Sequence, residues 1–290
     1  MIANDCVMES ISQVTSDLID LALKEDIGDG DVTSKYFVPE GQVSSAYIYA
    51  KADGVLAGAE IASEVFHRVD SSIQVKVVKD DGSALKFGDH VLEIEGDSRS
   101  ILTAERTALN FLQRLSGVAT NTSKYVAFTE GTKARILDTR KTTPGWRALE
   151  KMAVVAGGGT NHRMGLYDRA MVKDNHIVAQ DKMEAIQAAV RQLKKDLPKV
   201  EVELEADTLE QVESFLQMEG VDYILLDNMD NDQMERAVKM RGDSGPLLEA
   251  SGGVNLTTVA GIAQTGVDFI SVGALTHSAV ALDLSLEFRS

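Results

Sequence analysis

The order of hydrophobic and polar positions divides the chain into two parts with different rhythms. In the first part, apolar residues recur at helical spacing or in alternation, with glycine and aspartate turns between the segments. These segments together predict an α+β layer. The expected helices cover residues 16–24 and 59–68, and the expected strands cover 43–50, 73–78 and 90–96.

A longer helix is predicted over residues 100–116. At about 100° per residue its leucine, isoleucine and phenylalanine side chains fall on one face. Arg106 falls on the opposite, polar face, and Gly117 follows as a candidate C-terminal cap. We therefore expect the helix to bury its apolar face and to end at Gly117.

Beyond residue 130, apolar runs alternate with helical patterns. Buried parallel strands have nearly continuous apolar sequences, and helices connect them. The pattern therefore predicts a parallel α/β sheet, either a barrel or a doubly wound sheet. The apolar runs begin near residues 134, 170, 200, 223, 247 and 268, and the helical patterns cover 181–197, 208–219, 230–241 and 256–265.

Residues 281–288, near the end of the chain, alternate between apolar and polar side chains. Such alternation is typical of a half-buried antiparallel strand. We therefore expect the last strand to return to the first domain.

Composition narrows the classes of function. The 290 residues include 29 Lys and Arg against 45 Asp and Glu, a formal net charge of −16, which argues against binding of nucleic acid or membranes through bulk positive charge. The single cysteine, Cys6, excludes an intrachain disulfide and a cysteine-cluster metal site. With no readable signal peptide and no apolar run of membrane-spanning length, the sequence predicts a cytoplasmic protein.

Each apolar run of the second part ends in polar or glycine residues. Ligands of parallel α/β folds bind at the carboxyl ends of the strands, so six such ends predict one shared site. The residues at these ends include Asp138, Thr139, Arg140, Lys141, Lys173, Glu203, Asp227, Asn228, Glu249, Ser251, Gly252, Gly253, Ser271 and Gly273.

Positive charge gathers in residues 133–173, which carry nine basic and three acidic side chains. A basic segment at the ligand end of a sheet indicates an anionic small molecule, because each charge-assisted hydrogen bond to a carboxylate or phosphate contributes roughly 1.5–3 kcal/mol. We interpret four of the bases as ligand-binding and four as solvated surface cations. The first set is Arg140, Lys141, Arg163 and Lys173, and the second is Lys133, Arg135, Lys151 and Arg169.

Two glycine-rich turns, 249–253 and 271–278, have the composition of phosphate-binding loops at helix N-termini. Glu203 and Asp227 end adjacent predicted strands and could flank a shared centre that binds Mg²⁺ or sugar hydroxyls. For His162, a ligand role and a packed-loop role are equally open.

Seven segments carry a family resemblance. They are ERTALNFLQRLSGVAT (105–120), DTRKTTPGWRALEKMAVVAGGGTNHRMGLYD (138–168), VKDNH (172–176), EVELE (201–205), LLDN (225–228), EASGG (249–253) and ISVGALTHS (270–278). Together they resemble the quinolinate phosphoribosyltransferase family, also called nicotinate-nucleotide pyrophosphorylase (carboxylating). The resemblance extends from about Asp17 to Phe288, and DTRKT with GGGTNHR is its most specific part.

The resemblance implies an α/β fold of two domains, an N-terminal α/β sandwich and a C-terminal incomplete α/β barrel of the type II phosphoribosyltransferase kind. The sandwich would cover residues 1–116 and be joined by a C-terminal strand within 277–290, and the barrel would cover 117–276. It also implies a homodimer or larger homo-oligomer with shared active sites, in which Arg106 reaches the site of the neighbouring subunit.

The family reaction joins quinolinate to the ribose of phosphoribosyl pyrophosphate with Mg²⁺, and releases nicotinate mononucleotide, pyrophosphate and CO₂ in NAD biosynthesis. By this resemblance Glu203 and Asp227 would hold ribose hydroxyls and Mg²⁺, the metal directly or through water or substrate. The implied substrate-binding residues are Arg106, Thr139, Arg140, Lys141, His162, Arg163 and Lys173. The implied phosphate-binding residues are Ser251, Gly252, Gly253, Ser271 and Gly273. The implied catalytic residues are Lys141, Lys173, Glu203 and Asp227.

Three other interpretations stay open. A related phosphoribosyltransferase could use nicotinate or another monocarboxylate, although the full basic set favours a dicarboxylate. A barrel aldolase could use Lys173 as a Schiff-base lysine, but this leaves the arginines unexplained. A sensor of phosphoribosyl pyrophosphate would bind its ligand without turnover.

Overall fold

The computed structural model describes residues 12–173 and 182–289, which form two compact units. The chain crosses from one unit to the other four times. Of the described residues, unit 1 contains 12–121, 143–157 and 279–289, and unit 2 contains 122–142, 158–173 and 182–278.

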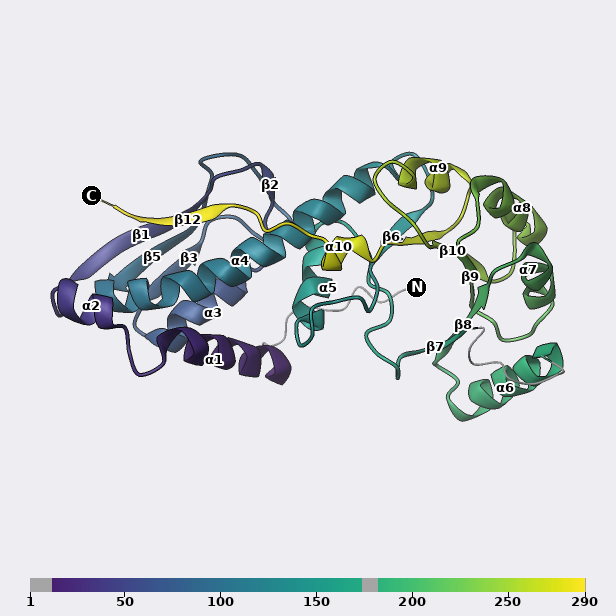
Figure 1. Cartoon of the computed structure of the whole chain (residues 1–290), viewed down its shortest axis with the longest axis horizontal. Coiled ribbons are helices and arrows are strands. Elements are labelled where there is room, and N and C mark those ends of the chain that lie inside the picture. The colour runs from purple at the N-terminus through teal and green to yellow at the C-terminus, as the bar shows by residue number, and fades with distance from the viewer. Residues whose placement is uncertain (1–11, 174–181, 290) are drawn as a thin grey trace. The chain divides into compact units, whose positions relative to one another are not determined.

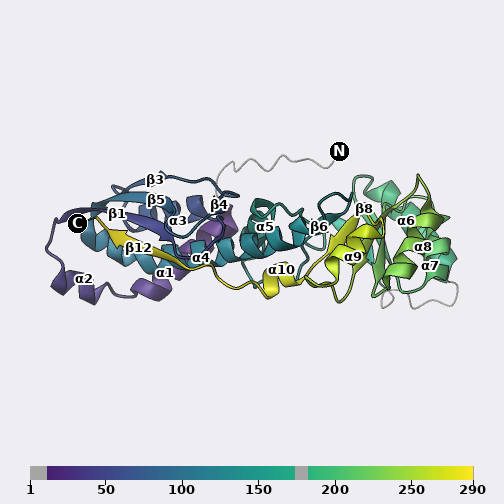
Figure 2. The same cartoon turned by 90° about the horizontal axis from the view of Figure 1, so that it is seen from above.

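Unit 1 is built on a four-stranded antiparallel sheet in the order β12, β1, β5, β3 (Figure 2). In β1 every second side chain from Ala46 to Ala50 is buried, because alternate residues of a strand face opposite sides of the sheet. Helix α3 packs against β3, and α1 packs against α3. The elements of this unit are α1 (Gln13–Ile27), α2 (Val32–Phe37), β1 (Val43–Ala50), β2 (Gly54–Val55), α3 (Ala59–Val69), β3 (Gln74–Val77), β4 (Ala84–Leu85), β5 (His90–Asp97) and β12 (Leu284–Phe288), with most of α4 (Ser98–Ala127) and all of α5 (Arg147–Ala156).

The alternating segment near the C-terminus forms the edge strand β12 of this sheet. It pairs antiparallel with β1, with Leu286 opposite Ile48. Leu282 and Leu284 are buried while Asp283 between them is exposed. The alternation in the sequence therefore reflects one covered and one solvated face.

Helix α4 is longer than the sequence predicts, and Gly117 lies inside it. A Cβ atom at Gly117 would lie 2.2 Å from the backbone oxygen of Val280, so the glycine allows the C-terminal segment to approach the helix closely. The predicted end of the helix at Gly117 is wrong. From the sequence alone, a glycine that ends a helix cannot be distinguished from one that allows another segment of the same chain to pack closely.

The segment that contains α5 lies in unit 1, whereas the predicted boundary at residue 117 assigns it to the barrel. Two long-range contacts explain its position. Glu150 accepts a hydrogen bond from Arg114 at 2.7 Å, and the ring of Trp146 stacks on Phe111 with centroids 4.8 Å apart. Contacts of this kind leave no periodic signal in the sequence.

Unit 2 contains a six-stranded parallel sheet in the order β6, β11, β10, β9, β8, β7. Each strand from β7 to β11 lies beside the next in sequence, and β11 lies beside β6, which is the order of a barrel. Within the described residues β6 and β7 do not pair, so the barrel is incomplete. The strands are β6 (Arg135–Leu137), β7 (Arg169–Val172), β8 (Glu201–Ala206), β9 (Tyr223–Asp227), β10 (Leu247–Ser251) and β11 (Phe269–Ser271).

Helices cover the outer side of this sheet, as Figure 1 shows for α6 to α9. A doubly wound sheet would reverse its strand order in the middle, and this sheet does not. The prediction of an α/β fold with an incomplete barrel is therefore confirmed. The helices are α6 (Lys182–Asp196), α7 (Leu209–Leu216), α8 (Asn231–Arg241), α9 (Val259–Gln264) and α10 (Ala274–His277).

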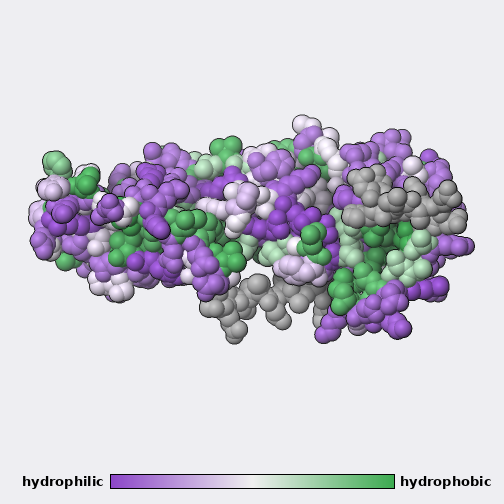
Figure 3. Space-filling model, turned by 60° about the horizontal axis from the view of Figure 1, so that its bottom comes forward, coloured by the Kyte–Doolittle hydropathy of each residue, from purple (hydrophilic) through white to green (hydrophobic). Residues whose placement is uncertain are grey.

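The face of the molecule in Figure 3 is predominantly hydrophilic, with smaller hydrophobic areas. This agrees with a chain in which 26% of residues are charged. Among the helices of residues 12–173 and 182–289, none is both long and apolar enough to cross a bilayer.

Candidate active site

The carboxyl ends of the barrel strands enclose a cavity of about 670 Å³, which we call the barrel pocket. Residues from five of the six strands, or from the loops that follow them, line this pocket, as is general for barrels of this type. The lining residues are Thr139, Arg140, Lys141, His162, Arg163, Met171, Lys173, Leu225, Asp227, Asn228, Glu249, Ser251, Gly252, Gly253 and Ser271.

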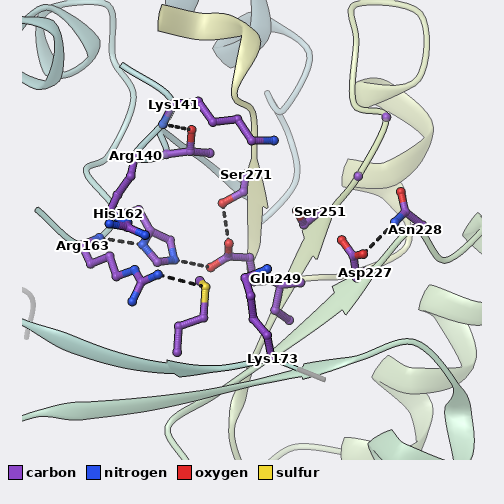
Figure 4. Close-up of a pocket in the computed structure, with 15 residues that line it drawn as sticks. Arg140, Lys141, His162, Arg163, Lys173, Asp227, Asn228, Glu249, Ser251 and Ser271 are labelled. Atoms are coloured by element: carbon purple, nitrogen blue, oxygen red, sulfur yellow. Dashed lines mark hydrogen bonds and ion pairs between the residues drawn. The ribbon is translucent and has the colours of Figure 1, made fainter. Parts of the chain in front are cut away.

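The pocket has two chemically different sides (Figure 4). Bases from the segments after β6 lie on one side, and acidic, amide and hydroxyl groups at the ends of β9 and β10 lie on the other. The labelled bases of the first side are Arg140, Lys141, His162 and Arg163, and the labelled residues of the second are Asp227, Asn228 and Ser251.

Strand β6 positions the basic side. Thr160 forms an isolated parallel bridge with Leu137, which brings the loop of His162 beside β6. The buried carboxylate of Asp138 then accepts a hydrogen bond of 2.8 Å from the backbone N–H of His162. Hydrogen bonds from the backbone and from the Asp138 carboxylate therefore join the DTRKT and GGGTNHR segments.

His162 is 7% exposed and meets two buried glutamates through Nε2. This atom lies 3.1 Å from a carboxylate oxygen of Glu203 and 3.4 Å from one of Glu249. Burial lowers the pKa of His162, but hydrogen bonding and attraction to both glutamates outweigh burial and raise it to about 9. At the other nitrogen, the Arg163 amide donates to Nδ1 at 2.6 Å, which favours the ring with its proton on Nε2. Both ring nitrogens are therefore engaged within the protein, and the glutamates hold the ring at the wall of the pocket.

Glu249 is a pocket residue to which the sequence assigned no role. Ser271 donates its hydroxyl to Glu249, and this bond with that from His162 outweighs burial and lowers the pKa of Glu249. Burial and the charge of Glu249 raise the pKa of Glu203. Glu249 is therefore the carboxyl of this pair that keeps its charge. The sequence did contain a signal for this role: a glutamate lies between Leu248 and Ala250 in an apolar strand, and a buried acid requires polar partners.

Arg163 and Arg169 differ in role. Burial, with the neighbouring Arg140, lowers the pKa of Arg163, which lines the pocket and donates to the backbone oxygen of Arg169 at 3.3 Å. Arg169 does not line the pocket: its guanidinium donates to Glu201 at 2.6 Å and lies 4.0 Å from the ring centre of Tyr223. The interpretation of Arg169 and Lys151 as solvated surface cations is wrong, because the Arg169 side chain is largely buried in this cluster and Lys151 is only 1% exposed.

The two lysines of the pocket have defined surroundings. The ammonium group of Lys173 pairs with Glu205. Thr276 donates its hydroxyl to the backbone oxygen of Lys141 at 2.8 Å, and Gly273 packs so closely on Lys141 that a Cβ there would lie 2.9 Å from Cδ. Asp174, Asn175 and His176 of the VKDNH segment lie outside the described residues.

The second side of the pocket is formed by two strand ends. Ser251 is opposite Asp227 in the parallel pair β9 and β10, and Gly252 and Gly253 continue from β10 with φ of 95° and 62°. These left-handed conformations favour glycine. They turn the backbone into the pocket, as a phosphate-binding loop requires.

Three predicted site residues do not line the pocket. Glu203 pairs with Tyr223 in the sheet, four residues before Asp227, so at about 3.3 Å per residue it lies roughly 13 Å deeper. It has no exposed surface and lies behind His162 and Glu249, which line the pocket. The structure therefore gives no support to a centre shared by Glu203 and Asp227. Gly273 contacts Lys141 instead, and Arg106 is exposed on α4 of unit 1.

Two family models match consecutive parts of the chain. The model described as quinolinate phosphoribosyl transferase, N-terminal domain, matches residues 31–116. The model described as quinolinate phosphoribosyl transferase, C-terminal domain, matches residues 118–287. Together they cover most of the sequence, including the whole barrel sheet.

Individual relatives agree with these models. The chain is 42% identical over 289 residues to the nicotinate-nucleotide pyrophosphorylase [carboxylating] of Mycobacterium leprae, covering 98% of this chain and 99% of the relative. It superposes on the nicotinate-nucleotide pyrophosphorylase of Francisella tularensis with a TM-score of 0.87, at 36% identity, over 97% and 99% of the two chains. For the Ehrlichia chaffeensis protein of the same name the TM-score is 0.86, at 37% identity, over 97% and 100%. The chain belongs to the quinolinate phosphoribosyltransferase family.

Proposed function

We propose that the barrel pocket is where this chain transfers the phosphoribosyl group of phosphoribosyl pyrophosphate to quinolinate, with release of nicotinate mononucleotide, pyrophosphate and CO₂ in NAD biosynthesis. The observation that carries the proposal is the two-sided pocket, with four bases facing Asp227 and the Ser251–Gly253 turn. One side suits binding of quinolinate, and the other suits binding of the phosphoribosyl group.

The basic side suits a dicarboxylate. Quinolinate carries two neighbouring carboxylates, and the guanidinium groups of Arg140 and Arg163 can each form a bidentate pair with one. His162 lies beside these arginines, and its contacts with Glu203 and Glu249 fix its ring at the wall of the pocket. Charge-assisted hydrogen bonds of this kind contribute roughly 1.5–3 kcal/mol each. A ligand fixed at both carboxylates would present its ring nitrogen to the ribose, which is catalysis by proximity.

The opposite side suits the phosphoribosyl group. The backbone N–H groups of the turn at Gly252 and Gly253 can receive the 5′-phosphate, and Ser251 adds a hydroxyl beside them. Positive charge develops on the ribose as pyrophosphate leaves, and the carboxylate of Asp227 would stabilise it and hold the ribose hydroxyls. Lys141 and Lys173 would neutralise the departing pyrophosphate.

Mg²⁺ fits this pocket through Asp227. The ion binds oxygen and commonly takes only one or two protein carboxylates, with phosphates and water completing its shell. Asp227 lines the pocket, whereas Glu203 is buried against His162 and does not. We propose that Asp227 holds a Mg²⁺ ion carried by phosphoribosyl pyrophosphate, which when bound supplies charge neutralisation of the leaving pyrophosphate.

Loss of CO₂ follows bond formation. Once the ring nitrogen carries the ribosyl group it is positively charged, and the electron pair of the breaking carbon–carboxylate bond can collect on the adjacent ring carbon as an ylide. This carbon then takes a proton from water, which gives nicotinate mononucleotide. The positive ring nitrogen favours this step, because it stabilises the negative charge that develops on the neighbouring carbon.

Assembly and location complete the proposal. The chain would act as a homodimer or larger homo-oligomer in the cytoplasm, with Arg106 of one subunit entering the barrel pocket of another. Support comes from the exposed position of Arg106 on α4. Quinolinate and phosphoribosyl pyrophosphate are small molecules, and neither nucleic acid nor a membrane would take part.

Turnover with two acids tests the proposal. The purified protein is incubated with phosphoribosyl pyrophosphate, Mg²⁺ and either quinolinate or nicotinate, while mononucleotide and CO₂ are followed. Product and CO₂ from quinolinate alone are expected. Product from nicotinate alone would contradict the dicarboxylate clamp, and no product from either acid would favour a sensor of phosphoribosyl pyrophosphate.

A further inference from the structure

Asn228 stands out in the backbone of the barrel pocket. Among the described residues it is the one non-glycine residue with a positive φ, of 53°. Asparagine tolerates this conformation better than most residues, so its presence could reflect the turn after β9 and nothing more. Its side chain makes contacts that this explanation does not require.

The backbone of Asn228 is tied to the neighbouring strand. Its N–H donates to the backbone oxygen of Ser251 at 2.9 Å. The side chain then occupies the space beside Gly252: a Cβ atom at Gly252 would lie 2.1 Å from Oδ1 of Asn228. The amide is therefore packed against the glycine turn and held in one place.

The other end of the amide contacts the carboxylate that faces the ligand. Nδ2 of Asn228 donates to Oδ2 of Asp227 at 2.6 Å, as Figure 4 shows. A carboxylate at the end of a strand would otherwise turn about its side-chain bonds, and each alternative orientation lowers the fraction competent to bind. The hydrogen bond leaves Oδ1 of Asp227 directed elsewhere in the pocket.

We propose that Asn228 is a positioning residue, whose amide fixes the carboxylate of Asp227 for the ribose and Mg²⁺ side of the substrate. This inference rests on the proposed function, because it takes Asp227 as the group that meets phosphoribosyl pyrophosphate. It adds a residue that acts through Asp227. Asn228 contacts both the carboxylate of Asp227 and the turn at Gly252. The position of the ribose-binding carboxylate is thereby fixed relative to the phosphate-binding turn.

The variant Asn228→Gly distinguishes the effect of the Asn228 side chain from the effect of the left-handed turn. Glycine adopts the left-handed backbone without strain, so the turn survives and only the amide is lost. We expect Asn228→Gly to bind Mg²⁺ and phosphoribosyl pyrophosphate at least about tenfold more weakly, since it loses a hydrogen bond to a charged group. Quinolinate alone should bind within about twofold of the wild type, because its bases lie on the other side of the pocket.

A double-mutant cycle tests whether Asn228 acts through Asp227. Binding of phosphoribosyl pyrophosphate with Mg²⁺ is measured by calorimetry for the wild type, Asn228→Gly, Asp227→Asn and the double variant, and kcat/KM is read for the same four proteins. The loss caused by Asn228→Gly should nearly disappear in the Asp227→Asn background. An equal loss in both backgrounds, or none in the wild-type background, would overturn the positioning role. A wild type that binds no phosphoribosyl pyrophosphate would overturn the proposed function, and this inference with it.

Discussion

Nε2 of His162 lies 3.1 Å from a carboxylate oxygen of Glu203, and both side chains are buried. With the second glutamate, Glu249, this contact raises the pKa of His162 to about 9 from an ordinary value of 6.5. The same carboxylates hold the ring in place and balance the positive charge that they favour on it. This relationship has consequences for stability as well as for binding.

We predict that His162 contributes stability that depends on pH. Because its pKa is raised in the folded state, the contribution is fully present below about pH 6.5 and is lost as the pH rises through about 9. A shift of this size corresponds to at most roughly 3 kcal/mol, and the Arg163 amide at Nδ1, which favours the neutral ring, reduces it. Urea unfolding of the wild type and His162→Gln between about pH 6 and pH 10 measures it. A difference in unfolding free energy that stays constant over this range would contradict the assignment.

Arg163 should recognise a carboxylate through the shape of its guanidinium. Arg163→Lys keeps the charge but loses the bidentate fork, so kcat/KM for quinolinate should fall roughly 10–100-fold. Arg135→Lys is the matched control, since Arg135 is exposed on β6 and does not line the pocket. Its kcat/KM should stay within about twofold of the wild type. Equal effects of the two changes would show that Arg163 has no specific contact with the substrate.

Gly117→Ala tests why a glycine lies inside α4. Alanine favours a helix by about 1 kcal/mol, but its Cβ would lie 2.2 Å from the backbone oxygen of Val280. We expect a net loss of roughly 2 kcal/mol or more in the free energy of unfolding. Gly261→Ala in α9 is the control, because its Cβ would meet only the movable side-chain nitrogen of Asn231 at 2.8 Å, and it should cost less than about 1 kcal/mol. If Gly117→Ala were as stable as the wild type, the close approach would not hold in solution.

Shared active sites predict complementation. In the proposed assembly one subunit would supply Arg106 and its partner Arg140 to each site, so Arg106→Ala and Arg140→Ala should each abolish most turnover. In mixed assemblies some sites would combine an intact Arg106 from one subunit with an intact Arg140 from the other. We expect mixing after dissociation and reassembly to restore activity, up to about a quarter of the wild-type value for random dimers. Mixed assemblies verified by mass that stay inactive would argue against sharing.

The sequence predicted the strands of the parallel sheet well because they are buried on both faces, whereas their closure into a barrel was implied only by the family resemblance. Apolar runs expected near 134, 170, 200, 223, 247 and 268 begin within about two residues of the observed strands, since such runs are continuous and flanked by clear helical patterns. Eleven of the predicted site residues line the pocket for a related reason. The carboxyl ends of parallel strands must meet, whatever the details of packing.

What the sequence missed depends on register and on contacts distant in sequence. Glu203 and Asp227 both follow apolar runs, but β8 continues to Ala206, so Glu203 lies deep in the sheet while Asp227 ends its strand. The segment with α5 belongs to the part matched by the C-terminal family model, as predicted, but ring stacking and an ion pair hold it in compact unit 1. Asn228 gave no signal beyond its place after a strand, because its role depends on Gly252 in another strand's loop.

The central claim is that the two sides of the barrel pocket divide the two halves of the reaction. A crystal structure of the protein with quinolinate bound tests it most directly. The account predicts both carboxylates against Arg140 and Arg163, with the ring nitrogen turned toward Asp227. Quinolinate bound outside the barrel pocket, or with its carboxylates in the Gly252 turn, would contradict it.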